Sequence, residues 1–218
     1  MNFTANDPAH VKYVPLFTFY LGTGCRMGEA LGLRWDDVDF ENRIIHITNA
    51  AKYRPGTDDK VQWMITEPKT KAGIRDIPMI DQVYDALKAE YKVQQERGFP
   101  TPTISGMTGF IFVNEEGRLR SPEAINRAID TITRWCNKEE EQKAQEENRE
   151  PIIIPHFSCH VFRHTFCTRF CENETNIKVI QEIMGHANIS ITMDIYAKTT
   201  EEKKKQVLDE LSKNMKIF

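Results

Sequence analysis

The spacing of apolar residues along the chain predicts a mainly helical protein. Between residues 8 and 21 the apolar positions are dense enough for a buried helix, which Gly22 and Gly24 would end. Further along, Ser121 followed by Pro122 is typical of a helix start, because serine caps free backbone N–H groups and proline fits the first helical position. Helices are also expected over the ranges 27–33, 81–97, 121–136, 158–172, 176–184, 188–196 and 201–214.

Shorter runs rich in β-branched and aromatic residues predict strands. Strands of one small antiparallel sheet are expected within 39–47, 61–66 and 74–77, and a further short strand at 110–113. The residues between 53 and 60 are expected to form a loop, and residues 68–78 a β-hairpin with a lysine at its tip. The sequence therefore predicts an α+β fold in one large domain, mainly α with a small antiparallel β-sheet.

Composition and charge limit the cellular compartment and the partners that we expect for this protein. No apolar run reaches the length of a membrane span, and the N-terminus lacks the layout of a signal peptide. Five cysteines, an odd number without a dense framework, fit a reducing compartment, so we expect a cytoplasmic protein with no membrane partner. The net charge of −3 owes much to the acidic stretch 138–150, expected to be solvated, and it leaves DNA binding open because phosphate contacts are local.

Four polar side chains in the C-terminal third suit work on a phosphodiester. His160 and Arg163 lie in residues 158–165, which read SCHVFRHT, and His186 and Tyr196 follow at near-helical spacing. A tyrosine hydroxyl, with an ordinary pKa of about 10, becomes a useful nucleophile when cations and hydrogen-bond donors gather the phosphate that it attacks. No metal-type carboxylate cluster accompanies these residues in the sequence, so the pattern favours attack without a metal.

Two upstream motifs complete the pattern. Residues 23–38 (TGCRMGEALGLRWDDV) place Arg26 after a glycine turn at the start of a helix, and residues 68–78 (PKTKAGIRDIP) carry Lys69. With residues 155–169 (PHFSCHVFRHTFCTR), these motifs follow the order found in tyrosine recombinases. Over nearly its whole length the chain resembles the catalytic domain of a tyrosine recombinase (phage-type integrase), and most closely the integrases of conjugative transposons.

The resemblance implies a role for each polar residue. Arg26 and Arg163 would clamp the non-bridging oxygens of the scissile phosphate, since a forked guanidinium fits two oxygens at once. His160 would assist proton transfer at the tyrosine or hydrogen-bond the phosphate, and His186 would donate a further hydrogen bond. Tyr196 would be the nucleophile that forms a 3′-phosphotyrosyl link.

The resemblance also implies how the reaction ends and reverses. Lys69 would be the general acid that protonates the departing 5′ oxygen, with Lys71 as a close rival. Because the phosphotyrosyl link conserves the energy of the broken bond, rejoining needs no nucleotide cofactor, and the family uses no metal in the chemical step. The implied fold is that of the catalytic core of the DNA breaking-rejoining enzymes.

The implied protein is a site-specific DNA recombinase that integrates and excises a mobile genetic element. Its partners would be double-stranded DNA, at the element ends and target junctions, and other copies of itself, as a tetramer in the full synaptic complex. Residues 1–218 would form the integrase catalytic domain, with the N-terminal arm-binding and core-binding domains of full-length relatives absent. The tail helix at 200–218 would pack on its own core or dock in trans on a neighbouring protomer.

Other interpretations stay open at this point. A type IB topoisomerase shares the core chemistry, and a non-catalytic DNA-binding relative would keep the fold without the reaction. His160 and His164, four residues apart on a helix, also suit a structural zinc site. Otherwise we expect His164 to be a structural histidine in the interior, and Arg75 to pair with Asp76 or a nearby phosphate.

Overall fold

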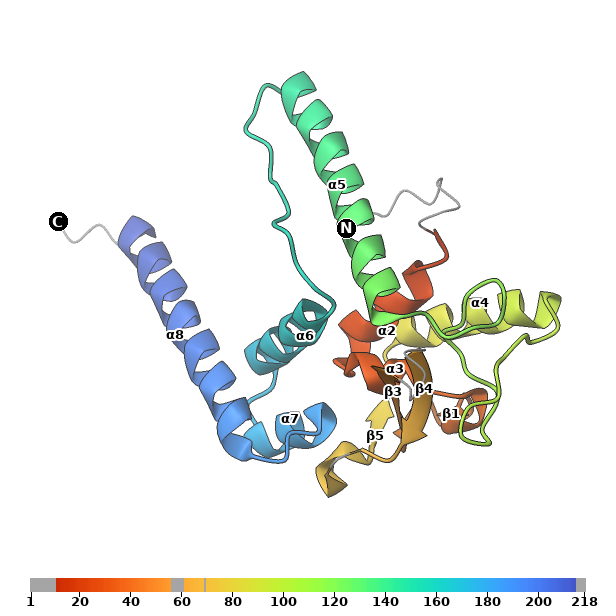
Figure 1. Ribbon diagram of the computed structural model, residues 1–218. Coiled ribbons are helices and arrows are strands. Elements are labelled where there is room, and N and C mark those ends of the chain that lie inside the picture. The colour runs from red at the N-terminus through yellow and green to blue at the C-terminus, as the bar shows by residue number, and fades with distance from the viewer. Residues whose placement is uncertain (1–10, 56–60, 69, 215–218) are drawn as a thin grey trace.

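The computed structural model describes residues 11–55, 61–68 and 70–214 of the chain, and most of them are helical (Figure 1). The helices are α2 (Val14–Thr23), α3 (Met27–Leu31), α4 (Asp81–Glu96), α5 (Pro122–Glu146), α6 (His160–Asn173), α7 (Ile177–Met184) and α8 (Ile189–Asn214), with short 3-10 turns η1 (Trp35–Asp37) and η2 (Lys71–Gly73). The strands are β1 (Val38–Asp39), β2 (Ile44–Ile47), β3 (Ala50–Pro55), β4 (Val61–Thr66) and β5 (Arg75–Pro78). The mainly α fold with small antiparallel sheets is confirmed.

The helices form two groups that meet at the site described below. Helices α2, α3 and α4 pack with the strands, whereas α6, α7 and α8 pack against one another (Figure 1). The groups join where α2 contacts α6 and where α7 contacts β5. The large core of the first group is apolar and dense, with Phe19, Tyr20, Leu87, Phe110 and Ile129 among its most buried side chains.

Two glycine turns end the helices that precede the functional side chains. Helix α2 ends at Gly24 and α7 at Gly185, with φ of 63° and 62°. These left-handed conformations favour glycine, because a Cβ atom would clash there. Helix α7 also starts on a defined cap, since the Asn176 side chain accepts hydrogen bonds from the backbone N–H groups of the first turn. The sequence thus sets both ends of α7 locally.

The strands form two separate antiparallel sheets rather than the one that we expected. In the order β1-β2-β5, Ile45 lies opposite Ile77, and both are buried. Strand β3 pairs with β4 and places Tyr53 opposite Trp63, with ring centroids 4.7 Å apart. Strand β3 falls partly where a loop was expected, because its alanine, lysine and arginine residues are weak strand formers and only the pairing with β4 makes them a strand.

The hairpin prediction for residues 68–78 was wrong. Strand β4, which precedes this segment, pairs with β3, whereas β5, which ends it, pairs with β2, so the two strands belong to different sheets. Between them the chain makes the η2 turn rather than a hairpin tip. The strand expected at 110–113 also reduces to isolated bridges, Arg34 with Phe110 and Val113 with Leu119.

Two helices are longer than their apolar patterns predicted. Helix α5 continues through the acidic stretch to Glu146, and the chain returns beside it, because Asn137 exchanges two 2.9 Å hydrogen bonds with the backbone of Ile154 (Figure 1). The helices expected at 188–196 and 201–214 are one helix, α8. In its middle, the hydroxyl groups of Thr199 and Thr200 donate to carbonyls four residues earlier, so both side chains are hydrogen-bonded within the helix.

Within the described ranges, none of the helices combines the length and the apolar character needed to span a bilayer.

Candidate active site

Arg26 begins α3 and is anchored by a carboxylate one turn further along. Its backbone N–H donates to Glu29 Oε2 at 3.0 Å, and its Nη1 donates to Glu29 Oε1 at 2.8 Å. The Glu29 side chain is only 4% exposed, whereas that of Arg26 is 45% exposed. The Arg26 guanidinium is therefore oriented by a buried partner but remains accessible, which suits a side chain that binds a phosphate oxygen.

Arg163, on α6, connects the turn before Arg26 to the end of α7. Its side chain is buried, and it donates from Nη1 to Gly24 O at 2.7 Å and from Nη2 to Met184 O at 2.6 Å. Burial and the neighbouring Arg26 cation lower the pKa of Arg163 to about 10, so it is still charged at neutral pH. In this arrangement each Nη group of the guanidinium donates a hydrogen bond to a backbone carbonyl.

The C-terminal end of α7 collects three arginines. Three consecutive backbone carbonyls each accept a hydrogen bond from a different one: Ile183 from Arg75 at 2.7 Å, Met184 from Arg163 at 2.6 Å, and Gly185 from Arg26 at 3.3 Å. The last carbonyls of a helix lack intrahelical partners and carry the negative end of its dipole. The end of α7 therefore binds and orients cations that come from three different elements.

His186 follows directly after this end. It is 5% exposed, and its Nδ1 lies 2.9 Å from the Thr192 hydroxyl on α8. Burial, together with Arg163 and Arg26, lowers the pKa of His186 to about 4, so the ring is neutral at neutral pH. In the tautomer in which Nδ1 accepts from Thr192, the single N–H of the neutral ring is on Nε2 and serves as a hydrogen-bond donor.

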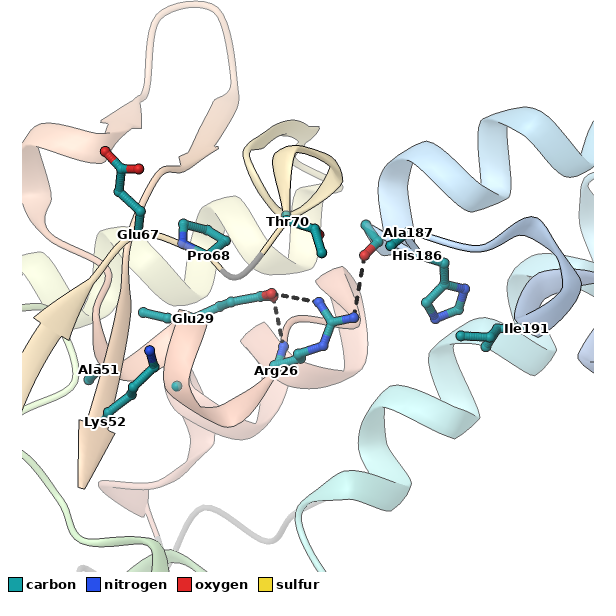
Figure 2. A pocket seen from close by; sticks show the side chains of 14 residues that line it. Arg26, Glu29, Ala51, Lys52, Glu67, Pro68, Thr70, His186, Ala187 and Ile191 are labelled. Atoms are coloured by element: carbon teal, nitrogen blue, oxygen red, sulfur yellow. Dashed lines mark hydrogen bonds and ion pairs between the residues drawn. The ribbon is translucent and has the colours of Figure 1, made fainter. Parts of the chain in front are cut away.

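Arg26 and His186 line the same cleft, which has a volume of about 450 Å³. Figure 2 shows Arg26 between Glu29 and the turn that carries His186. The other lining residues come from α3, strand β3, the β4–β5 connection and the start of α8, and they include Lys52, Glu67, Pro68, Thr70 and Ile191. An open cleft with a half-exposed guanidinium on one wall and a neutral imidazole on another is suited to a single phosphate group.

The expected general acid cannot be placed in the same way. Lys69 lies outside the described residues. Its neighbours Pro68 and Thr70 both line the cleft, and its rival Lys71 is exposed on η2.

Tyr196 and His160 are not among the described residues that line the cleft. Tyr196 is half-buried on α8, where it packs against a small apolar cluster that contains Cys167, Ile180 and Met184. His160 is exposed at the start of α6, and burial of part of its ring, followed by the neighbouring His164 and Arg163, lowers its pKa. The structure thus brings Arg26, Arg163 and His186 together at the end of α7; of these, Arg26 and His186 line the cleft, whereas Arg163 and Tyr196 do not.

The interior position expected for His164 was wrong, because its side chain is exposed. Positions 163, 167 and 171 share one face of α6, and that face is buried, so His164 lies outside it. Its ring meets that of His160 edge to face, with centroids 4.6 Å apart. Within the described ranges, no three His, Cys, Asp or Glu side chains gather as metal ligands do.

Sequence reasoning missed two residues of this site, Glu29 and Arg75. Arg75 was expected to pair with Asp76, but it donates from Nη2 to Glu29 Oε2 at 2.8 Å, and Asp76 instead contacts His46. Glu29 could have been found, because a glutamate three residues after a helix-starting residue is a capping pattern. Arg75 offered no such local signal, since Glu29 lies 46 positions away.

Comparison with known proteins identifies the family. The profile of the phage integrase family matches residues 1–203. The chain belongs to this family. It is 32% identical over 198 residues to the transposase from transposon Tn916 of Enterococcus faecalis, which covers 91% of this chain and 45% of that protein. This phage integrase family member therefore spans about half the length of the curated relatives that it matches.

Other relatives place the chain among tyrosine recombinases. A XerC-like tyrosine recombinase of Caldanaerobacter subterraneus subsp. tengcongensis is 28% identical over 204 residues, covering 90% of this chain and 48% of that protein. Among solved structures, the Tn1549 transposon integrase in complex with transposon right end DNA is 30% identical, with a TM-score of 0.77 over 96% of this chain and 62% of that one. The resemblance to integrases of conjugative transposons is confirmed.

Proposed function

We propose that this chain is the catalytic part of a site-specific DNA recombinase. It cleaves and rejoins DNA strands through a covalent 3′-phosphotyrosyl link to Tyr196, and it serves the integration and excision of a mobile genetic element. The observation that carries the proposal is that Arg26 and His186 line one cleft, while Arg163 binds the backbone next to both of them at Gly24 and Met184, in a chain of the phage integrase family. The similarity to the transposase from transposon Tn916, and to the Tn1549 integrase in complex with transposon right end DNA, supports the choice of substrate.

The cleft residues hold the phosphate. Arg26 offers its guanidinium to one non-bridging oxygen, and His186 donates a hydrogen bond to the phosphate from its free ring N–H. Arg163 binds the phosphate as well once one of its Nη groups releases its backbone carbonyl, at Gly24 or Met184, and donates to a phosphate oxygen instead. These donors stabilise the extra negative charge that develops on the oxygens as the phosphorus becomes five-coordinate.

Tyr196 supplies the nucleophile. Its phenolic oxygen forms a bond to phosphorus while the bond to the 5′ oxygen breaks, and Lys69 gives a proton to that oxygen. His160 assists removal of the phenolic proton or binds the phosphate. Tyr196 lies on α8 and packs against the cluster of Cys167, Ile180 and Met184. The first turn of α8 reaches the cleft at Ile191, so a shift of α8 on binding DNA would bring the Tyr196 hydroxyl to the phosphate.

Rejoining reverses these steps with a new 5′ hydroxyl as the attacking group. No bond energy is lost, so the cycle balances without a nucleotide or a metal. Strand exchange between two DNA partners needs several active sites, and we propose a tetramer on DNA, with the C-terminal tail, residues 200–218, as a candidate contact in trans. The partners are double-stranded element ends and target junctions.

Two other functions predict different products. A type IB topoisomerase would relax supercoiled DNA without exchanging partners, and a non-catalytic relative would bind DNA without forming an adduct. The similarity to transposon integrases favours recombination over both.

A suicide substrate tests the proposal. A duplex with the end sequence of the element that encodes the chain is nicked just beyond the cleavage position, so that the freed fragment diffuses away. The chain is incubated with it in EDTA, at concentrations above the dissociation constant measured in the same buffer, and covalent adducts are resolved on a denaturing gel. We expect an adduct with the native chain, none with Tyr196→Phe, and an unchanged yield with Tyr91→Phe, a partly exposed tyrosine on α4. Binding without an adduct would establish the non-catalytic alternative.

A further inference from the structure

Among the described cations around the cleft, Arg75 has the most hydrogen-bond partners, although it does not line the cleft. Its side chain is 6% exposed and forms an ion pair of 2.8 Å with Glu29, which is 4% exposed. Its Nε donates to Ile183 O at 2.7 Å, and its Nη1 donates to Gly73 O at 3.0 Å. One planar side chain thus joins the carboxylate on α3, the η2 turn and the end of α7.

Each of these partners orients a residue of the site. Glu29 also holds Arg26, so the two arginines share one carboxylate. Ile183 precedes the turn that carries His186 by only a few positions. Arg75 also packs directly against that turn, because a Cβ atom on Gly185 would lie 2.9 Å from Arg75 Nη1. A displacement of Arg75 is therefore transmitted to Arg26 and His186 together.

The chemistry of arginine explains why this position needs it. The guanidinium presents several N–H donors in a fixed plane, and here Nε, Nη1 and Nη2 each have a different acceptor. A lysine at the same position would keep the positive charge but could not span all three acceptors with one point charge. With lysine, Glu29 on α3 and the end of α7 would no longer be joined through one side chain, while the charge of the cluster would stay the same.

We propose that Arg75 is a positioning residue for DNA cleavage: it locks the end of α7 to Glu29, so that Arg26, Arg163 and His186 converge on one phosphate. This inference rests on the proposed function. Arg75 itself touches no substrate, and its contribution is the relative placement of the groups that do.

The first test compares two variants of the same kind. Arg75→Lys removes the fork but keeps the charge. Arg34→Lys is the matched control, because Arg34 also pairs with a buried carboxylate, Asp37, yet does not line the cleft. Single-turnover adduct formation is measured at saturating suicide DNA, and the dissociation constant is measured separately. We expect Arg75→Lys to slow cleavage about 10- to 100-fold, as when reacting groups shift by roughly an ångström, with the dissociation constant within threefold of the native value. The control keeps the native rate.

Chemical rescue separates placement from general loss of structure. A cavity of about 130 Å³ is lined by Arg75 and His186, so a small cation can approach the vacated space. In Arg75→Ala, millimolar guanidinium is expected to raise the cleavage rate at least tenfold over the rate without it. Ammonium at the same concentration lacks the planar fork and is not expected to raise the rate. Equal rescue by both ions would contradict the requirement for the planar fork.

A measurement without DNA keeps this inference separate from the proposed function. The ring resonances of His186, assigned by their loss in His186→Gln, are compared in the native chain, Arg75→Lys and Arg34→Lys. Shifted His186 resonances only in Arg75→Lys support the positioning role. Native-like resonances, or a cleavage rate per folded molecule equal to that of the native chain, overturn it. If the native chain forms no adduct, the proposed function fails, and the His186 resonances still decide whether Arg75 sets the placement.

Discussion

The buried, neutral state of His186 should make the stability of the protein depend on pH. The ring is 5% exposed and lies among the arginines at the end of α7, and its pKa is lowered to about 4 from an ordinary value of 6.5. The unfolded chain has no such burial, so as pH falls it binds the proton first. The stabilising contribution is therefore complete above pH 6.5 and is lost as pH falls from 6.5 towards 4.

The size of this effect follows from the two pKa values. Each pKa unit corresponds to about 1.4 kcal/mol, so the free energy of unfolding should fall by about 3 kcal/mol between pH 7 and pH 4 through His186 alone. For a domain of ordinary stability, about 3 kcal/mol is a large fraction of the total.

The assay is urea denaturation at several pH values between 7 and 4, on the native chain and on His186→Gln. Other groups also titrate in this range, so the quantity of interest is the difference between the two pH profiles. The variant is expected to lack the His186 contribution, which leaves its profile flatter by about 3 kcal/mol. Parallel profiles, or a His186 ring that titrates near pH 6.5 by NMR, would refute the reasoning.

Two further changes probe the same region. Glu29→Gln leaves Arg26 and Arg75 without their shared buried anion, so we expect a loss of about 3 kcal/mol in the free energy of unfolding, and slower cleavage per folded molecule; a denaturation midpoint equal to the native one would contradict this. Gly185→Ala puts a Cβ atom at φ 62° and 2.9 Å from Ala72 O, so we expect a loss of about 1–3 kcal/mol together with shifted His186 resonances, with Gly98→Ala as a control for the left-handed strain alone, since nothing lies within 4 Å of that site.

Much of the local structure could be predicted because its causes are local. The Ser121 cap starts α5, and the glycines at 24 and 185 end α2 and α7, each through hydrogen bonds or backbone conformations within a few residues. The motifs around Arg26 and Arg163 could likewise be recognised, because each is a short stretch of consecutive residues. These features indicated the family, and the comparisons confirmed it.

The errors fall where distant segments decide the structure. Strand β3 exists because β4 pairs with it, and helix α5 is extended beyond its apolar pattern with a return segment held at Asn137. The partner of Arg75 was misassigned, because an adjacent aspartate is the obvious choice in the sequence and only folding brings Glu29 within 2.8 Å.

The sequence by itself determined which side chains are available for the reaction and which helices carry them, since capping, glycine turns and helical period act over a few residues. The tertiary structure decided how those side chains meet. Arg163 bonds to Gly24 across 139 positions, and three arginines from separate elements share the end of α7. Contacts over such separations depend on the packing of whole elements, and for that reason the packing of Tyr196 against the cluster of Cys167, Ile180 and Met184 emerged only from the fold.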